Sequence, residues 1–202
     1  MSIEKYLLSQ GTPLSTLPKI AGTYRDKRIV ICADAACIWA DLKNFGCRSA
    51  NGVAKDGWDF MCVNRAVETF PGKIEHAYSN QSVVLRRFIR SRRDEYVHEF
   101  GGPLHNHAVH GDGWSVEWPW IGHGTSGLGA ALTAVALGYG RVVLAGMPLD
   151  DGPHNGEPPW RLTRFTTEAP NGNEHWKKAI DVAFDGKVKS LSGRTKDWLG
   201  CP

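Results

Sequence analysis

The stretch from Ile121 to Asp151, IGHGTSGLGAALTAVALGYGRVVLAGMPLDD, constrains the fold of this chain most strongly. It begins with a glycine-rich loop, whose backbone can approach a ligand closely because its glycines carry no Cβ. Leu128–Leu137 consists of small apolar residues on nearly every side, which predicts a buried helix. Arg141–Gly146 is a short apolar run, typical of a parallel strand covered on both faces. Loop, helix and strand in this order predict a nucleotide-binding α/β domain.

The start of this helix is a candidate phosphate site. Thr125 or Ser126 stands where a helix N-cap is expected. A helix N-terminus presents free N–H groups and a partial positive charge, so it suits an anion. We therefore expect Gly124, Thr125, Ser126 and Gly127 to contact a nucleotide.

The string Gly122–Gly127 also matches the dinucleotide pattern GxGxxG formally. That pattern should follow a strand, and Pro119 interrupts the only segment that could form one. The acid that the pattern requires would be Asp150 or Asp151, at a stretched spacing. A phosphate-contacting loop is therefore the preferred interpretation, with a purely structural turn as the alternative.

Three upstream strands are predicted, and each is followed by or ends in a polar residue. They are Arg28–Ala33, Asp59–Asn64 and Lys73–Asn80. Ligands of open parallel sheets bind beyond the carboxyl ends of the strands. Asp34, Asn64 and Asn80, together with Asp150 after the later strand, are therefore the remaining candidate nucleotide-binding residues.

The rest of the chain fits one domain preceded by an arm. Residues 1–27 are expected to form the arm, and residues 28–202 a single Rossmann-like α/β domain with a mostly parallel sheet and helices on both faces. Gly101–Trp120 is predicted to be irregular, and Pro148–Asn173 a long loop that serves as a lid or binding loop. The remaining predicted elements are helices at Ile3–Ser9, Ile38–Asn44, Ser82–Arg93, Glu174–Phe184 and Arg194–Leu199, and strands at Tyr96–Phe100 and Lys187–Leu191.

Charge and cysteine content limit the partners and the compartment. The net charge of +3 is too small to indicate nucleic acid. Arginine is concentrated within Arg86–Arg93, which is either a solvated helix face or a patch for an anionic partner. The five cysteines include no CxxC pair and indicate a reducing compartment. Without a signal peptide or a long apolar run, the chain is expected to be soluble and cytoplasmic.

Several histidines are candidates for metal binding or for general base catalysis. His105, His107 and His110 form H-x-H-x-x-H, which resembles the metal-binding string of metallo-β-lactamase-like hydrolases but has Val109 in the place of the acid. The alternative is a loop whose histidines form local hydrogen bonds. His175 and His154 are candidate general bases, or ordinary surface histidines.

The run TSGLGAALTAVALGYGRVVLAGMPLD resembles the core motif of the bacterial sialyltransferases of glycosyltransferase family 42. It is similar also to related phage and bacterial Rossmann-like proteins that include an archaeal pterin diphosphokinase group. Asp59–Asn64 and Lys73–Asn80 match strands of that family that end in Asn, and His175 falls where the family has its catalytic histidine.

This resemblance implies transfer of a sugar from a CMP-type donor to an acceptor hydroxyl, with inversion and without a metal or other cofactor. Asn64, Asn80, Ser126 and Gly127 would contact the nucleotide, and His175 would be the general base. The family has glycines where this chain has Ala33–Ala36. That difference favours the alternative of a non-catalytic nucleotide-binding or phage accessory protein, while a metal-dependent hydrolase is the third hypothesis. Self-association into a homo-oligomer is a further expectation.

Overall fold

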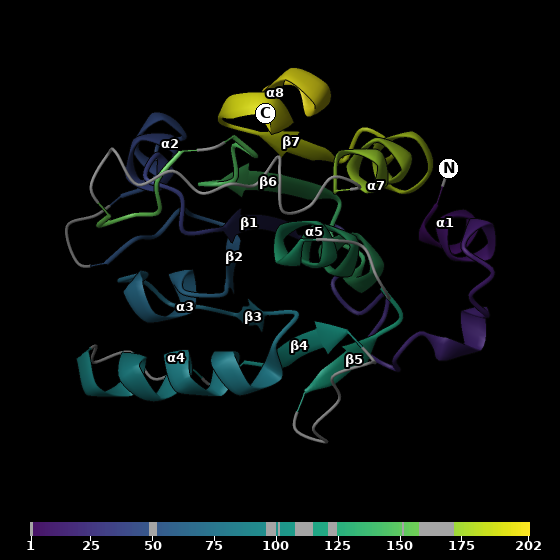
Figure 1. Ribbon diagram of the computed structural model, residues 1–202, viewed down its shortest axis with the longest axis horizontal. Helices are drawn as coiled ribbons and strands as arrows, with labels where there is room; N and C mark the ends of the chain where they lie inside the picture. The colour runs from purple at the N-terminus through teal and green to yellow at the C-terminus, as the bar shows by residue number, and fades with distance from the viewer. Residues whose placement is uncertain are drawn as a thin grey trace.

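The computed structural model describes residues 2–48, 52–95, 100, 102–107, 115–120, 125–150, 152–157 and 172–202. Within them, seven strands form one sheet in the order β5-β4-β3-β2-β1-β6-β7, and every neighbouring pair is parallel. This arrangement confirms the predicted α/β fold class (Figure 1). The strands are β1 (Arg28–Cys32), β2 (Asp59–Val63), β3 (His76–Tyr78), β4 (Leu104–His107), β5 (Val116–Trp118), β6 (Arg141–Ala145) and β7 (Val188–Ser190).

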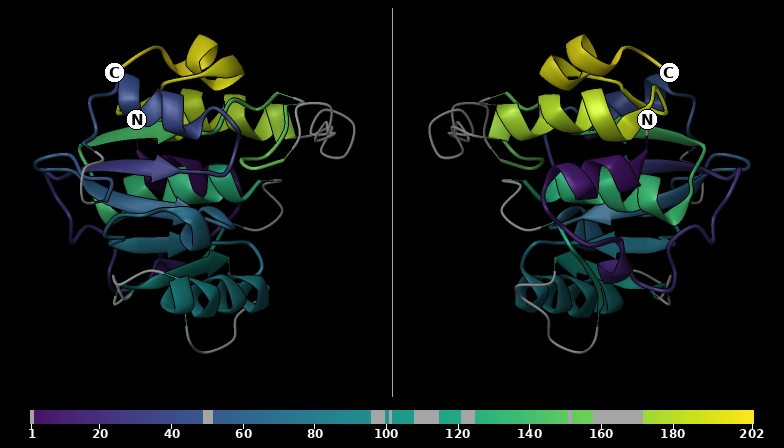
Figure 2. Two further views of the ribbon diagram at one scale, coloured as in Figure 1. Left: turned by 90° about the vertical axis from the view of Figure 1, so that its left-hand side faces the viewer. Right: turned by 90° about the vertical axis from the view of Figure 1, so that its right-hand side faces the viewer.

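Helices cover both faces of the sheet, as Figure 2 shows from two sides. One face carries α2 (Ile38–Asn44), α3 (Ala66–Thr69) and α4 (Ser82–Glu95). The other carries α1 (Ile3–Ser9), α5 (Ser126–Leu137), α7 (Gly172–Ala179) and the π-helical turn η3 (Ile180–Phe184). The 3₁₀ turn η1 (Leu14–Thr16) lies in the arm, and α8 (Gly193–Leu199) packs beside β7.

Alternation along the strands creates the two cores. In β1, Ile29 and Ile31 face α5, whereas Val30 and Cys32 face α2 and α3. All four side chains are fully buried, because successive residues of a strand point to opposite faces of the sheet. The sequence therefore reads as a continuous apolar run, as expected for a doubly covered strand.

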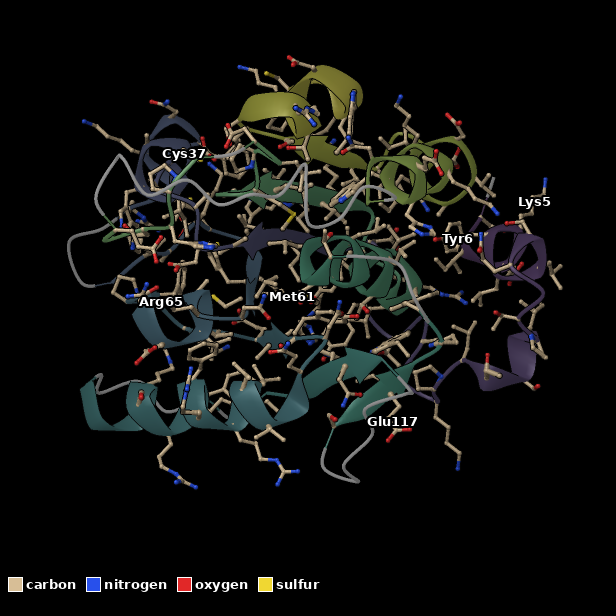
Figure 3. All side chains as sticks on the ribbon, viewed as in Figure 1. Lys5, Tyr6, Cys37, Met61, Arg65 and Glu117 are labelled. Atoms are coloured by element: carbon tan, nitrogen blue, oxygen red, sulfur yellow. The ribbon has the colours of Figure 1, made fainter. Side chains whose placement is uncertain are left out.

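The N-terminal arm packs on the domain. Tyr6 of α1 is fully buried and meets Trp120 edge to face at 6.5 Å between ring centroids; Figure 3 labels this tyrosine. Farther along, the backbone N–H groups of Gly22 and Tyr24 donate to carbonyl oxygens at the end of α5. The arm thus contributes to the core on the α5 face.

The prediction that Gly101–Trp120 is irregular is wrong in part, because β4 and β5 lie within it. Pro119 follows the last residue of β5, so the proline removes no ladder hydrogen bond and the glycine-rich loop does follow a strand. The short helix α3 was also not expected. The strand predicted at Tyr96–Phe100 lies almost wholly outside the described residues, and α4 continues to Glu95.

Candidate functional site

A pocket of about 440 Å³ lies where β1, β2 and β6 end and α5 begins. Strand order reverses between β1 and β6, because the chain moves from β1 outward to β5 and then returns across α5 to β6. Ligands of doubly wound sheets bind at such a switch point. A volume of this size suits a small molecule.

The pocket brings together most of the residues predicted from sequence. Asn80 touches its edge through its backbone N–H, which donates to Ser126 Oγ at 3.2 Å. His175 lies in α7 and does not line the pocket. Gly124 lies outside the described residues. The predicted residues that line the pocket are Asp34, Asn64, Thr125, Ser126, Gly127 and Asp150.

The first turn of α5 is capped and held from outside. Thr125 is the N-cap, and its hydroxyl oxygen accepts a hydrogen bond from the Leu128 N–H at 3.1 Å. Trp176 donates to the same oxygen from α7 at 3.2 Å. The N-terminus of α5, with its partial positive charge, is therefore fixed at the pocket wall.

Two glycines of α5 are required by close packing. A Cβ on Gly127 would lie 2.6 Å from Met147 Sδ, and one on Gly129 would lie 2.1 Å from Tyr78 Oη. These positions let the helix approach β3 and the turn after β6. Close packing thus accounts for both glycines, and Gly127 also lines the pocket, so its predicted nucleotide contact stays a prediction. Gly122 and Gly124 lie outside the described residues.

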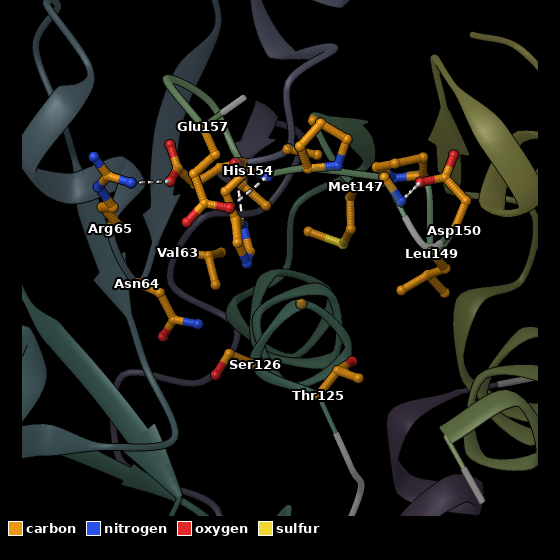
Figure 4. Close-up of a pocket in the computed structure, with 18 of the residues that line it drawn as sticks. Val63, Asn64, Arg65, Thr125, Ser126, Met147, Leu149, Asp150, His154 and Glu157 are labelled. Carbon is orange, nitrogen blue, oxygen red and sulfur yellow. Dashed lines mark hydrogen bonds and ion pairs between the residues drawn. The ribbon is translucent and has the colours of Figure 1, made fainter. Parts of the chain in front are cut away.

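Asn64 presents a side-chain amide to the pocket. Its φ of 52° is left-handed, a conformation that asparagine tolerates better than most residues. Ser79 Oγ donates to its Oδ1 at 2.7 Å, and its backbone N–H donates to the Tyr78 carbonyl at 3.0 Å. With Oδ1 engaged, the Nδ2 group is the side of the amide that faces Ser126 and the pocket (Figure 4).

Asp34 is a buried carboxyl group with weak partners. It is only 7% exposed, and a side-chain hydrogen bond with Thr69 acts on it. The Arg65 guanidinium lies 3.8 Å from Oδ2. Burial raises the pKa of Asp34 to about 6, against the opposing influence of Arg65 and His154.

Three charged or titratable residues of the pocket, Arg65, His154 and Glu157, were not assigned to it from sequence. Arg65 directly follows Asn64, so its position after β2 was the available signal. His154 and Glu157 lie in the long loop after β6, which was expected to be a lid or a binding loop. His154 was considered as a general base from sequence, but nothing in the sequence placed it or Glu157 beside Asp34.

The described residues include no group of three His, Cys, Asp or Glu side chains arranged to hold a metal ion. The metal hypothesis is corrected at His105, because both of its ring nitrogens are engaged. Trp118 Nε1 donates to Nδ1 at 3.0 Å, and Nε2 lies 3.0 Å from His76 Nδ1. The His107 side chain and all of His110 are outside the described part of the chain.

His105 instead begins a buried hydrogen-bond chain with a fixed direction. Because Trp118 can only donate, His105 must donate through Nε2 to His76 Nδ1. His76 Nε2–H then donates to Tyr139 Oη at 2.9 Å, and Tyr139 donates to Asp59 Oδ2 at 2.8 Å. Burial lowers the pKa of His76 to about 4 and also lowers the pKa of His105. Both imidazoles are therefore neutral near neutral pH.

The predicted exposed arginine cluster is corrected at Arg92. Arg92 is only 1% exposed, and its guanidinium donates to the backbone carbonyls of Val67, Phe70 and Gly72. It supports the turn between α3 and β3. Arg87 and Arg90 remain exposed on α4.

No protein-family model matches the sequence, and no curated protein matches it. Among solved structures, the chain is similar to the sialyltransferase CstII from Campylobacter jejuni, determined in complex with a substrate analogue, CMP-3FNeuAc. That similarity covers 87% of this chain and 86% of the other, with 12% sequence identity and a TM-score of 0.48. Similarity at this level carries no conclusion about ligand or activity.

No helix among the described residues is both long and apolar enough to cross a bilayer.

Proposed function

We propose that this pocket binds a nucleotide-linked sugar and that the protein transfers the sugar to an acceptor hydroxyl. One observation carries the proposal: the N-terminus of a twelve-residue helix, α5, faces the strand ends at the switch point across a single pocket. A helix end of this kind is suited to bind an anion such as a phosphate group.

The groups around the pocket fit the parts of such a donor. The Nδ2 group of Asn64 and the hydroxyl of Ser126 suit phosphate or ribose oxygens. The carboxyl of Asp34 suits hydrogen-bond donors, such as ribose hydroxyls or the amino group of a base. Val84 and Phe88 of α4 add an apolar wall against which a ring can lie.

The proposed reaction needs a sugar donor, an acceptor hydroxyl and one group that takes up the proton of this hydroxyl. The acceptor oxygen forms a bond to the anomeric carbon of the sugar, and the bond from that carbon to the donor phosphate oxygen breaks. Its electron pair leaves with the nucleotide, and the acceptor proton moves to a histidine. The sequence resemblance implies His175 for this role, as a general base.

A binding experiment tests the proposal. Cytidine, uridine, adenosine and guanosine nucleotides, free and sugar-linked, are screened for an increase in melting temperature, which a ligand of the folded state produces by mass action. Asn64→Asp is the matched variant, because it keeps the acceptor for Ser79 and replaces the Nδ2 donor by an anionic oxygen. We expect it to weaken nucleotide affinity by about tenfold or more.

Each result has a separate meaning. Indifference of the wild-type protein to all nucleotides overturns the proposed function. Nucleotide binding without transfer to any acceptor supports the non-catalytic alternative. Equal affinity of the wild type and Asn64→Asp shows that a nucleotide binds elsewhere.

A further inference from the structure

Among the described residues that line the pocket, the histidine is His154. His154 lines the cavity, and Figure 4 shows its ring pointing into it beside Val63 and Met147. His175 lies on α7, one residue before Trp176, and is not part of the lining. We propose that His154, through its Nε2 atom, is the proton acceptor of this pocket. The chemistry assigned to it rests on the proposed function, whereas its geometry does not.

The backbone on both sides of His154 is fixed to the turn after β1. The Ala36 N–H donates to the Pro153 carbonyl at 3.0 Å, and the Asn155 N–H donates to the Asp34 carbonyl at 2.8 Å. The Trp39 indole donates to Asn155 Oδ1 at 3.1 Å. This short segment therefore holds the imidazole at a defined place above the strand ends.

A backbone carbonyl selects the tautomer of the ring. His154 Nδ1 lies 3.3 Å from the carbonyl oxygen of Asp34. A carbonyl oxygen only accepts hydrogen bonds, so Nδ1 must carry the proton. In the neutral ring Nε2 then holds the lone pair and can accept a proton from a substrate.

Carboxyl groups lie near the ring on more than one side. Glu157 Oε2 accepts a hydrogen bond from the His154 backbone N–H at 3.3 Å, and the Asp34 carboxyl interacts electrostatically with the imidazole. Asp150 also lines the pocket, and Arg65 opposes these carboxylates beside Asp34.

In the proposed transfer, the acceptor hydroxyl loses its proton to His154 Nε2 while its oxygen bonds to the anomeric carbon. The nucleotide leaves with the electron pair of the broken carbon–oxygen bond. The imidazolium then returns its proton to water, which restores the neutral ring with Nδ1 still protonated. No oxidant, reductant or metal ion enters this balance.

The first test reads the tautomer directly. The full chain is labelled with the heavy nitrogen isotope in its histidine rings, and His154→Asn assigns the His154 signals by their loss. At a pH above the ordinary pKa of histidine, we expect a protonated Nδ1 and an unprotonated Nε2. The opposite tautomer overturns the proposal, whether or not a nucleotide binds.

The second test compares matched variants with a donor that raises the melting temperature. His154→Asn keeps an amide N–H for the Asp34 carbonyl and removes only the acceptor at Nε2. We expect its turnover to fall by about 100-fold or more, with little change in donor affinity. His175→Asn is expected to lose less.

A greater loss in His175→Asn than in His154→Asn overturns the assignment of His154 and leaves the proposed function standing. If no nucleotide binds the wild-type protein, the proposed function fails, and the tautomer measurement decides the assignment alone.

Discussion

The indole Nε1 of Trp176 donates a hydrogen bond of 3.2 Å to the hydroxyl oxygen of Thr125. Trp176 is fully buried in α7, and Thr125 is the N-cap of α5 at the pocket wall. One oxygen atom thus satisfies an N–H group of each helix, since it also accepts from Leu128. The end of α5 that lines the pocket is thus fixed by a residue that lies late in the chain.

Thr125→Val should show what this shared acceptor contributes. Valine keeps the shape but leaves two donors without a partner, so we expect the free energy of unfolding to fall by about 1–2 kcal/mol. Urea unfolding measures the change, and Thr125→Ser, which retains the oxygen, is the control. A valine variant as stable as the wild type would show that the cap is dispensable.

Gly129→Ala should destabilise the protein more than Gly127→Ala. The Cβ at 129 meets the ring of Tyr78, which is fully buried and cannot move aside. The Cβ at 127 meets the flexible thioether of Met147. We expect a loss of about 1–3 kcal/mol at 129, partly offset by the higher helix propensity of alanine. Thermal unfolding of the two variants, made side by side, tests the order; the reverse order would contradict this packing.

The elements that were predicted best are those with a strong local pattern. α1 and α2 match their predicted ranges. Ser2 caps the start of α1, and Gly11 and Gly46 follow the C-cap residues of the two helices. After their first residues, Arg28 and Arg141, β1 and β6 are apolar and buried, since both faces are covered. The two central strands of the sheet and the helix that lines the pocket could therefore be predicted from local sequence patterns.

The elements that were missed depend on contacts between distant segments. β4 reads LHNH, and its His105 and Asn106 are buried only because side chains from other strands meet them there. The pocket also depends on contacts between distant segments. The hydrogen bond between His154 and the Asp34 carbonyl joins residues 120 positions apart. No spacing rule within a single sequence reveals such a pair.

Arg92→Met should be far more harmful than Arg90→Met. The buried guanidinium of Arg92 donates to the Val67 carbonyl at 3.3 Å and to the Gly72 carbonyl at 2.5 Å, and methionine leaves these oxygens without a donor. We expect a loss of about 2–4 kcal/mol in the free energy of unfolding. Arg90 is exposed, so the matched change there should stay within about 0.5 kcal/mol. Similar losses at both positions would refute the structural role of Arg92.

Acid should destabilise the protein through His76. Burial lowers the pKa of His76 to about 4, below its ordinary value of 6.5. The unfolded chain therefore binds a proton that the folded chain excludes, and stability falls as pH drops through this window. His76→Gln cannot titrate, so its stability should decline less than that of the wild type between neutral pH and pH values near the lowered pKa. Parallel curves from urea unfolding would contradict the prediction.

Asp34→Asn should stabilise the protein at neutral pH. The folded-state pKa of Asp34 is raised to about 6 from an ordinary value of 3.8, so here the folded chain binds the proton more tightly. The contribution of the acid to stability is present at low pH and is lost as pH rises through about 6. Asparagine stays neutral, and we expect a gain on the order of 1–3 kcal/mol above this pH. Loss of the ion pair with the exposed Arg65 subtracts little from it.

Urea unfolding across the acidic and neutral range measures this gain as the difference between the variant and the wild type. The difference should grow as pH rises and then level off above the folded-state pKa; a difference that shrinks with rising pH would contradict the assignment. If the same variant also binds nucleotides more weakly, the chain retains a destabilising buried acid because its ligand needs it, which is the trade-off expected at a functional site.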